Sequence, residues 1–313
     1  MYGRGSVPAH TIPCVISESS DSMYICTTWK DYEVIDAGSG EKLERWGDKI
    51  LLRPDPQAIW PAERQHPAWQ KIDGIYHRSS EGGGEWEFRT KMPERWAVAY
   101  GDLKFKIKPL GFKHTGLFPE QAVNWDWMRA QIAAAQQEGR PQPSVLNLFA
   151  YTGGATVACA AAGATVAHVD AAKGMVNWAG ENLELSGLTN SRVRFLVDDC
   201  LKFVQREERR GRKYDAVLMD PPSYGRGPGG EMWKLEEKLF ELVSACMGIL
   251  SDKPLFFLIN SYTTGLQPLV LENMLKMTVV KKFGGRAEAA EVGLPITATG
   301  LTLPCGASGR WRR

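Results

Sequence analysis

Three carboxylic acids in the second half of the chain each follow a short apolar segment of the kind that forms a buried strand. They are Asp170, Asp199 and Asp220. Asp170 stands 17 residues after Gly153, and a carboxylate at this distance from a glycine turn can accept hydrogen bonds from both hydroxyls of a ribose. The pattern therefore predicts a nucleoside-type ligand bound across the ends of several strands.

A glycine-containing turn precedes these acids. It comprises Ala150, Tyr151, Thr152, Gly153 and Gly154, directly after the apolar residues that end at Phe149. Glycine lets the backbone approach a ligand closely at a strand-to-helix turn. Such a pair alone is equally consistent with close packing of a helix on a strand. The spacing to Asp170 favours the ligand-binding interpretation.

Apolar strands alternate with helical patterns from about residue 125 onward. Strands are predicted at 145–149, 165–169, 193–197, 216–219 and 255–259, and helices at 125–137, from 154, and at 173–185, 201–209 and 231–250. Buried strands separated by helices are typical of a doubly wound parallel sheet, whose strands have their carboxyl ends along one edge. We therefore expect an α/β fold in which the acids and the glycine turn meet at that edge.

The first part of the chain has a different pattern. Residues 1–22 are rich in Ser, Pro and Gly and lack an apolar period, which predicts a flexible arm. Strand signals follow, at 32–35, 49–52, 96–99 and 103–107. We therefore divide the chain into the arm, a β-rich N-terminal domain at 23–108 and a catalytic domain at 109–313.

Composition excludes several classes of protein. Of the 313 residues, 43% are hydrophobic and 24% are charged, which suits a chain with a sizeable core and rules out fibrous and disordered proteins. No apolar run could span a membrane and no signal peptide is evident, so we expect a cytoplasmic protein. The six cysteines lack a CxxC pair, so we expect reduced thiols and no metal site. The net charge of +2 names no partner.

The order and spacing of these motifs resemble a class I S-adenosylmethionine-dependent methyltransferase. The residues that carry the resemblance are Leu146–Gly154, Val169–Asp170, Asp199–Cys200 and Asp220–Pro222. They are similar to the bacterial 23S ribosomal-RNA methyltransferases of the RlmI/RlmK kind, over roughly residues 100–304 and including Lys113–Gln121. The resemblance implies a Rossmann-like, seven-stranded methyltransferase sheet. The N-terminal 95 or so residues do not look like the RNA-binding PUA domain often found in that family.

The resemblance also implies S-adenosyl-L-methionine as the cofactor. It places Asp170 on the ribose and Asp199 on the adenine amino group, with Ala171 and Cys200 beside the adenine ring. The other implied cofactor residues are Gln121, Asn147, Phe149, Ala150, Tyr151, Thr152, Gly153, Gly154 and Asp220. Among them, Asn147 and the turn are assigned to the methionine end, and Gln121 is expected to close over the cofactor.

The segment after the fourth predicted strand is expected to hold the acceptor. Methyltransferases that act on ring or exocyclic nitrogens use an Asp-Pro-Pro-Tyr-like strand end, in which oxygens accept from the target amine and an aromatic ring stacks on the flipped base. We therefore assign catalysis to Asp220, Pro221, Pro222 and Tyr224, although Ser223 intervenes. Cytosine-C5 chemistry needs a cysteine thiolate, and none follows the fourth or fifth predicted strand. A nitrogen acceptor is thus favoured over cytosine C5.

RNA, and ribosomal RNA in particular, is the acceptor that the resemblance favours. Candidate RNA contacts are Lys104, Lys106, Lys108 and Lys113, and the terminal Arg310–Arg313 either pairs with nucleic acid or forms a frayed tail. The acceptor could instead be a small molecule or a protein. A nicotinamide-dependent oxidoreductase is a remote alternative, because Asp170 could hold a dinucleotide ribose although the turn lacks the GxGxxG pattern. No membrane or metal partner is expected, and an oligomer is compatible with the sequence.

Overall fold

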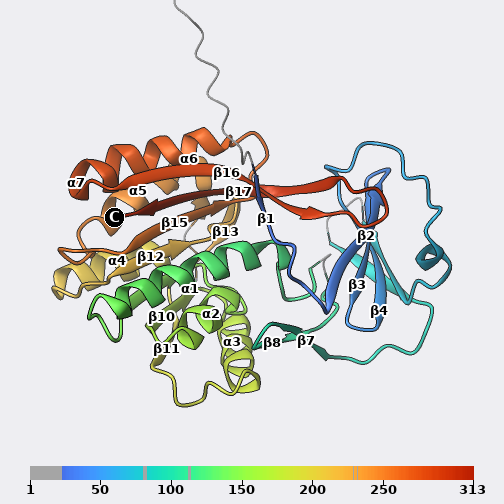
Figure 1. Cartoon of the computed structure of the whole chain (residues 1–313), viewed down its shortest axis with the longest axis horizontal. Coiled ribbons are helices and arrows are strands. Elements are labelled where there is room, and N and C mark those ends of the chain that lie inside the picture. The colour runs from blue at the N-terminus through green and yellow to red at the C-terminus, as the bar shows by residue number, and fades with distance from the viewer. Residues whose placement is uncertain (1–22, 80–82, 112–113, 228, 231) are drawn as a thin grey trace, which may run out of the picture.

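The computed structural model describes residues 23–79, 83–111, 114–227, 229–230 and 232–313. Two parts lie side by side (Figure 1), a larger one in which helices cover both faces of a sheet and a smaller one made mainly of strands. The arm predicted at 1–22 and the candidate RNA contact Lys113 lie outside the described residues. The smaller part comes largely from the first third of the chain.

The large sheet confirms the predicted α/β fold. Within the described ranges it has eight strands in the order β1-β16-β17-β15-β12-β9-β10-β11, parallel to their neighbours except for β17. The strands are β1 (Met23–Ile25), β9 (Ser144–Leu148), β10 (Thr165–Asp170), β11 (Val193–Val197), β12 (Ala216–Met219), β15 (Phe256–Ser261), β16 (Arg286–Pro295) and β17 (Thr302–Arg312). Seven of them form the Rossmann-like sheet expected from the sequence, and β1 adds an eighth beside β16.

Helices cover both faces of this sheet because its central strands are apolar on both sides. Ala216 and Leu218 of β12 belong to one hydrophobic cluster, and Val217 and Met219 belong to another. Helices α1 to α3 contribute to the first cluster and α4 to α6 to the second. The helices are η2 (Pro119–Gln121), α1 (Ala122–Gln137), α2 (Gly154–Ala161), α3 (Lys173–Leu185), α4 (Cys200–Arg209), α5 (Leu235–Cys246), α6 (Pro268–Leu275), η3 (Lys276–Val280) and α7 (Lys281–Phe283).

The strand order reverses between β9 and β12. From β9 the chain moves outward to β10 and β11, and it then returns to β12 on the other side of β9. At such a switch point the connections leave in opposite directions and open a crevice beyond the carboxyl ends of the two strands. The predicted site residues that follow β9 and β12 therefore meet at this crevice.

The smaller part contains a five-stranded sheet and a two-stranded hairpin among the described residues. Its elements are β2 (Tyr32–Gly38), β3 (Glu41–Trp46), β4 (Lys49–Pro54), η1 (Pro67–Gln70), β5 (Gly74–Arg78), β6 (Gly84–Phe88), β7 (Trp96–Tyr100) and β8 (Leu103–Ile107). Strand β3 was not predicted, although it lies between β2 and β4. Its apolar pattern is interrupted by Glu44, which is charged and yet fully buried.

The long hairpin of β16 and β17 joins the two parts. Figure 1 shows it in red, running from the large sheet to the β-rich part. There Thr297 N donates to Val34 O at 3.0 Å. One hydrophobic cluster also contains residues of both parts, among them Trp46 and Met128. The two parts therefore share a core.

Candidate active site

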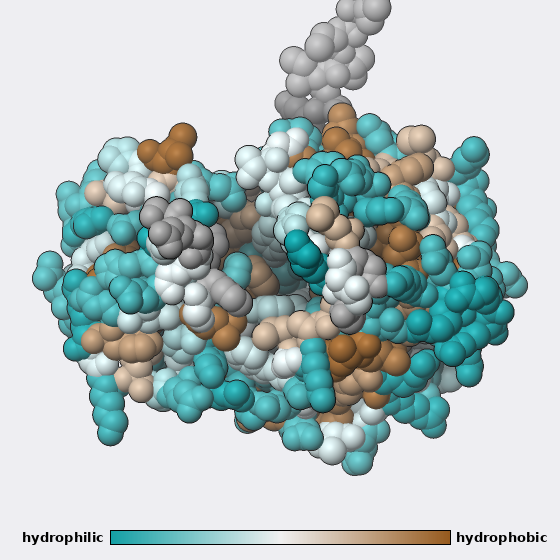
Figure 2. Space-filling model, turned by 180° about the vertical axis from the view of Figure 1, so that it is seen from behind, coloured by the Kyte–Doolittle hydropathy of each residue, from teal (hydrophilic) through white to brown (hydrophobic). Residues whose placement is uncertain are grey.

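The crevice at the switch point opens into a cavity between the two parts. The cavity has a volume of about 670 Å³, and a narrower inner pocket lies beyond β9 and β12. Figure 2 shows the molecule hollowed between its smaller and larger parts. Phe149, Tyr151 and Asp220 line both the cavity and the inner pocket, so the two spaces adjoin.

The turn after β9 has an unusual backbone conformation. Phe149, Tyr151 and Gly153 have positive φ angles of 53°, 51° and 83°. Residues other than glycine rarely adopt this region, and such conformations concentrate at functional sites. The hydrogen bond from Ala150 N to Val169 O, at 3.1 Å, ties the turn to β10. The surrounding structure therefore holds the turn in one shape against the cavity.

The two glycines of the turn allow close packing. A Cβ atom on Gly153 would lie 2.7 Å from the Cβ of Ala179, and one on Gly154 would lie 2.7 Å from the ring of Trp125. Thr152 and Gly154 line the inner pocket, whereas Gly153 lies behind the lining. Gly153 thus packs against α3, and Gly154 packs against Trp125 and also faces the pocket.

Asp170 lies at the end of β10 and lines the cavity together with Ala171. Its Oδ2 accepts from Tyr151 N and its Oδ1 from Ala172 N, each at 2.8 Å. Burial raises the pKa of Asp170, and the two backbone donors lower it. The carboxyl group is held in place at the wall, where its remaining lone pairs can accept from a ligand.

Asp199 and Cys200 line the cavity at the end of the next strand. Asp199 caps α4, because its Oδ1 accepts from Lys202 N at 2.8 Å. Cys200 accepts from Phe149 N at 3.3 Å, and burial raises the pKa of its thiol well above the ordinary value. The sequence-predicted adenine-side residues are thus brought together on one wall.

Buried amides line the inner pocket. Asn147 of β9 donates to Thr156 Oγ1 at 2.9 Å. Gln121 of η2 donates to the hydroxyl of Tyr262 at 2.7 Å and accepts from Asn124 Nδ2 at 2.8 Å. With 7% of its surface exposed, Gln121 belongs to the interior. Asn147, predicted for the methionine end, and Gln121, expected to close over the cofactor, thus both line the inner pocket, each in its own hydrogen-bond network.

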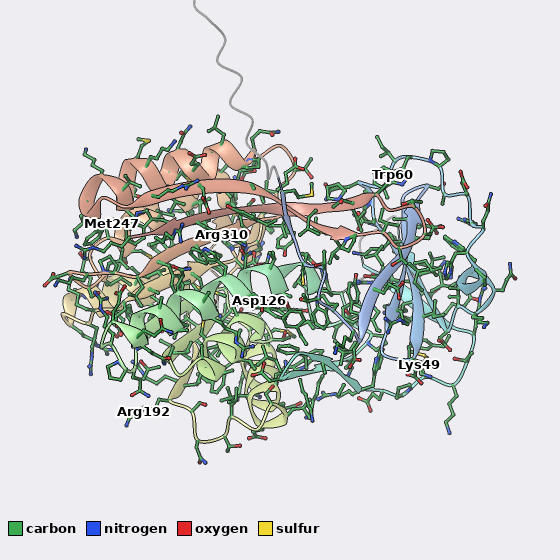
Figure 3. The ribbon with its side chains drawn as sticks, in the orientation of Figure 1. Lys49, Trp60, Asp126, Arg192, Met247 and Arg310 are labelled. Atoms are coloured by element: carbon green, nitrogen blue, oxygen red, sulfur yellow. The ribbon has the colours of Figure 1, made fainter. Side chains whose placement is uncertain are left out.

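Arg310 of β17 extends the network of Gln121 and Asn124. Its Nε and Nη2 donate to Asn124 Oδ1 at 2.9 and 2.6 Å, and its guanidinium lies 3.7 Å from the ring centroid of Tyr24. Figure 3 shows Arg310 within the larger part, and Trp311 beside it is fully buried. The expectation that this end of the chain is frayed or pairs with nucleic acid is wrong for these two residues, because β17 lies inside the sheet.

Asp220 directly follows β12 at the junction of the two spaces. Burial, and then the negative charge of Glu120, raise the pKa of Asp220 to about 7. Glu120 of η2 lines the same cavity, and burial raises its pKa as well. A carboxyl group that titrates near neutral pH is suited to accept and release a proton during a reaction.

The proline pair connects Asp220 to a small hairpin of β13 (Tyr224–Arg226) and β14 (Met232–Lys234). Pro221 and Pro222 line the cavity. Tyr224 is 55% exposed and lies outside the lining, so the structure does not bring this predicted stacking residue to the site. Ser223 adds one residue before the extended strand, which directs the tyrosine toward solvent.

Trp233 of β14 provides the aromatic ring at this place. It lines the cavity, its ring centroid is 4.8 Å from that of Phe149, and its Nε1 donates to Pro222 O at 2.7 Å. Sequence reasoning missed Trp233 because it stands 13 residues after Asp220, across a glycine-rich loop. Its role depends on the pairing of β13 with β14.

The β-rich part also contributes charged residues to the cavity wall. They are Lys42, Arg53 and Asp55. They were not among the sequence-based candidates, since they lie far from every motif along the chain. The signal that could have indicated them was a run of charged residues in strands that are otherwise apolar.

Comparison with known proteins gives the class of enzyme to which this site belongs. A family model described as S-adenosylmethionine-dependent methyltransferase matches residues 64–249, which is more than half of the chain. The chain belongs to this family. It is therefore a methyltransferase that uses S-adenosylmethionine, as the sequence predicted, and the oxidoreductase alternative is set aside.

Individual proteins that are similar to this chain are methyltransferases as well. A crystal structure of the SAM dependent methyltransferase from Agrobacterium tumefaciens is 34% identical, with a TM-score of 0.87 over 100% of this chain and 97% of that one. Ribosomal RNA large subunit methyltransferase K/L from Shewanella frigidimarina is 32% identical over 204 residues, 64% of this chain and 25% of the relative. Its namesake from Legionella pneumophila is 27% identical over 67% of this chain and 28% of the relative. The chain thus spans about a quarter of the length of these curated relatives.

The residues of this methyltransferase fit the cofactor. The hydroxyl of Tyr151 is buried beside the inner pocket and has no hydrogen-bond partner among the described residues. Buried hydroxyls are almost always paired, so a polar group of a bound ligand is expected to satisfy it. A methyltransferase complexed with SAH shares the fold, with a TM-score of 0.69 at 17% identity over 92% of this chain and 76% of that one.

Three further observations concern membrane-spanning helices, metal-binding clusters and the cysteines. In the described part of the chain, none of the helices is long and apolar enough to cross a membrane. The described residues likewise contain no cluster of three or more His, Cys, Asp or Glu side chains that could bind a metal ion. Each described cysteine is a free thiol.

Proposed function

We propose that this methyltransferase transfers a methyl group to a nitrogen of a base in RNA, and that the RNA is ribosomal. The observation that carries the proposal is the position of Asp220, whose side chain borders both the inner pocket and the wider cavity. The methionine end of the donor, in the inner pocket, and an acceptor in the wider cavity would both lie beside this carboxyl group. The methyl group and the acceptor atom can then meet beside Asp220.

The walls of the two adjoining spaces suit the cofactor, whose adenosine end would lie along the wider cavity and whose methionine end would reach into the inner pocket. Asp170 accepts from the ribose hydroxyls, Asp199 accepts from the adenine amino group, and Ala171 and Cys200 border the adenine ring. The methionine end lies among Gln121, Asn147, Phe149, Ala150, Tyr151, Thr152 and Gly154, in a turn that Gly153 shapes. When bound, S-adenosylmethionine supplies a methyl group on a positively charged sulfur, which makes that carbon electrophilic.

Catalysis then depends mainly on positioning. The carboxylate of Asp220 accepts a hydrogen bond from the target N–H group and so directs the nitrogen lone pair. As the N–CH₃ bond forms, the nitrogen gives its proton to Asp220, whose pKa of about 7 allows its release at neutral pH. Pro221 and Pro222 fix the backbone beside the base, and Trp233 offers a ring on which the base stacks.

One observation favours a second candidate, cytosine-C5 methylation. Cys305 of β17 lines the cavity, a position that its place in the sequence did not suggest. Burial raises the pKa of the Cys305 thiol well above the ordinary value, which disfavours the thiolate that C5 chemistry needs. The variant Cys305→Ser separates the candidates, because it retains methyl transfer to nitrogen and abolishes transfer to cytosine C5.

Support for RNA comes from the relatives and from the rim of the cavity. The curated relatives are named as large-subunit ribosomal RNA methyltransferases. Arg226 is exposed on β13 and also lines the cavity, where it can contact a phosphate. Lys106 and Lys108 are weaker candidates, since their ammonium groups lie 3.0 and 3.3 Å from the carboxylates of Glu181 and Glu94.

Mass spectrometry of ribosomal RNA nucleosides tests the proposal. Cells that lack the protein should lose one methylated base, and the purified protein with S-adenosylmethionine should restore it to their RNA. Asp220→Asn should bind the cofactor without restoring the methyl group. Methyl transfer to a protein or a small molecule, with an unchanged set of RNA nucleosides, would refute RNA as the acceptor.

A further inference from the structure

The wall that the β-rich part contributes to the cavity lies outside the region matched to the family. Lys42, Arg53 and Asp55 line the cavity, and all three precede residue 64, where the family match begins. The machinery common to the matched region therefore does not account for them. Their charged side chains are largely buried, which is unfavourable unless a partner or a ligand compensates.

In the inner layer of this wall, protein groups compensate the buried charges. Glu44 is fully buried and accepts from Arg53 Nε at 2.6 Å, from Arg53 Nη2 at 2.8 Å and from the Tyr32 hydroxyl at 2.6 Å. Although burial raises the pKa of Glu44, Arg53 and its other partners hold it at about 2. Arg53 and Glu44 thus form a fixed ion pair, of which Arg53 reaches the cavity wall and Glu44 lies behind it.

Lys42 and Asp55 form the outer layer. Lys42 Nζ lies 3.3 Å from Asp55 Oδ2 and 3.7 Å from Glu44 Oε1. The side chains of Lys42 and Asp55 are 15% and 11% exposed, and both line the cavity. An ion pair shielded from bulk water adds little to stability, because desolvation offsets the attraction. A role toward a ligand accounts for such a pair in this position.

Groups of the larger part face the same space. Glu120 is 6% exposed and lines the cavity. Burial raises its pKa, and the positive charge of Lys42 partly offsets that rise. Asp220 and Tyr262 line the cavity as well. A molecule held beside Asp220 therefore meets hydrogen-bond donors and acceptors from both parts of the chain.

We propose that Lys42 and Asp55 contact the acceptor base and determine which base is methylated. The ammonium group donates to a carbonyl oxygen or ring nitrogen, and the neighbouring carboxylate accepts from an N–H group. A donor beside an acceptor complements the hydrogen-bonding edge that a base presents once it is unpaired and flipped. The inference rests on the proposed function, since it takes the acceptor to be a nucleobase. It makes the β-rich part a specificity-determining part of the active site.

Steady-state kinetics with the full chain, S-adenosylmethionine and RNA from the deletion strain test this inference. Lys42→Met and Asp55→Asn should each raise the KM for RNA by about tenfold or more, because a buried partner is left unpaired. The Kd for the cofactor should stay within about twofold of wild type. If Lys42→Met does not fold, Asp55→Asn provides the same comparison with almost no change in shape.

Lys49→Met is the matched control. Lys49 lies on β4, as Arg53 does, but its ammonium group pairs with exposed Asp48 at 3.2 Å and it lies outside the cavity lining. Figure 3 shows Lys49 on the β-rich part. This variant removes one positive charge from the same sheet, so a general electrostatic effect on RNA would appear in it too. We expect its KM for RNA to equal that of wild type.

Exchanging the pair, Lys42→Asp together with Asp55→Lys, separates recognition from structure. The exchange keeps an ion pair between the two positions and the net charge, but it removes the contact of Lys42 with Glu44. The comparison is therefore made on exchanged protein that keeps the wild-type melting temperature, for which a purely structural role predicts a wild-type KM. Recognition predicts a raised KM, because donor and acceptor have changed places. A wild-type KM in the folded exchanged protein overturns the inference. If wild-type protein methylates no RNA base, the proposed function fails as well, and nucleoside analysis shows that without any variant.

Discussion

Asp220 combines burial at a strand end with a carboxyl neighbour. Taking the side chain out of water raises its pKa, and the negative charge of Glu120 raises it further, to about 7. Burial raises the pKa of Asp170 as well, but two backbone N–H groups that donate to this carboxyl group oppose the rise. The surroundings thus suit Asp220 to proton transfer and Asp170 to binding.

The first prediction concerns pH. We expect kcat/KM for RNA to rise as the pH increases through about 7, because only ionised Asp220 can accept from the target N–H group. Glu120→Gln removes the negative charge that raises the pKa of Asp220, so the midpoint should move to lower pH. Rate profiles between about pH 5 and 9 measure both. An unchanged midpoint in a variant that still binds the cofactor would show that Glu120 does not act on Asp220.

The second prediction concerns the ribose. Asp170→Ala should weaken S-adenosylmethionine binding by about tenfold or more, since the loss of hydrogen bonds to a charged group is worth about 1.5 to 3 kcal/mol. Asp102→Ala is the control, because Asp102 pairs with Arg129 and lies outside the cavity lining. Calorimetric titration of both folded variants measures the difference. Equal affinities would remove the ribose assignment.

At the scale of elements, the turn between β9 and α2 determines how closely a ligand and α1 can approach. A Cβ atom on Gly154 would lie 2.7 Å from the ring of Trp125, which is 2% exposed. We expect Gly154→Ala to displace that ring, to lower stability by about 1 to 3 kcal/mol and to weaken cofactor binding. Thermal melting and calorimetry measure the two effects.

Gly180→Ala in α3 is the control for this third prediction. A Cβ atom there meets no other group within 4 Å, so alanine should be neutral or slightly stabilising in the helix. If Gly154→Ala matches this control in both measurements, the close contact with Trp125 does not constrain the turn.

Much of the larger part could be predicted because its elements have simple patterns. Strands such as β9 and β12 are apolar on both faces, and their carboxyl ends lie along one edge of a parallel sheet. That geometry brings the residues after each strand together. The β16–β17 hairpin was not predicted because glycines interrupt its apolar pattern. One of them is Gly309, where an added Cβ atom would lie 2.9 Å from the Cβ atom of Leu271.

The candidate site could likewise be predicted only in part. Asp170, Asp199 and Asp220 were expected at one place from strand order alone, and their roles toward the cofactor remain predictions. Lys42 and Trp233 could not be found in this way, because they reach the cavity through the folding of distant segments. Contacts of that kind depend on tertiary packing, which a local pattern does not contain.

At the scale of the whole molecule, the two parts share one hydrophobic core. A single hydrophobic cluster includes residues of both, and Trp29 Nε1 donates to Pro119 O at 2.9 Å. The hydroxyl of Tyr100 also bonds to Asp126 on α1. Domains joined only by a small polar interface often unfold separately, whereas these two parts also share buried apolar side chains.

The fourth prediction follows from this shared core. Calorimetry should show a single unfolding transition, with equal calorimetric and van't Hoff enthalpies. Adding S-adenosylmethionine should move the whole transition to higher temperature, because the ligand binds only the folded protein. Two resolved transitions, of which only one responds to the cofactor, would contradict a shared core.

A ribosome makes β2 long before it makes the hairpin that covers it. The contact from Thr297 N to Val34 O joins residues that, at about 5 to 20 residues per second, are synthesised on the order of ten seconds or more apart. Strand β15 likewise lacks its neighbour β17 until the hairpin emerges. The growing chain therefore carries unpaired strand edges, which invite mispairing. We expect stalled nascent chains that end before β16 to be cut rapidly by protease in both parts, and chains that include β17 to resist.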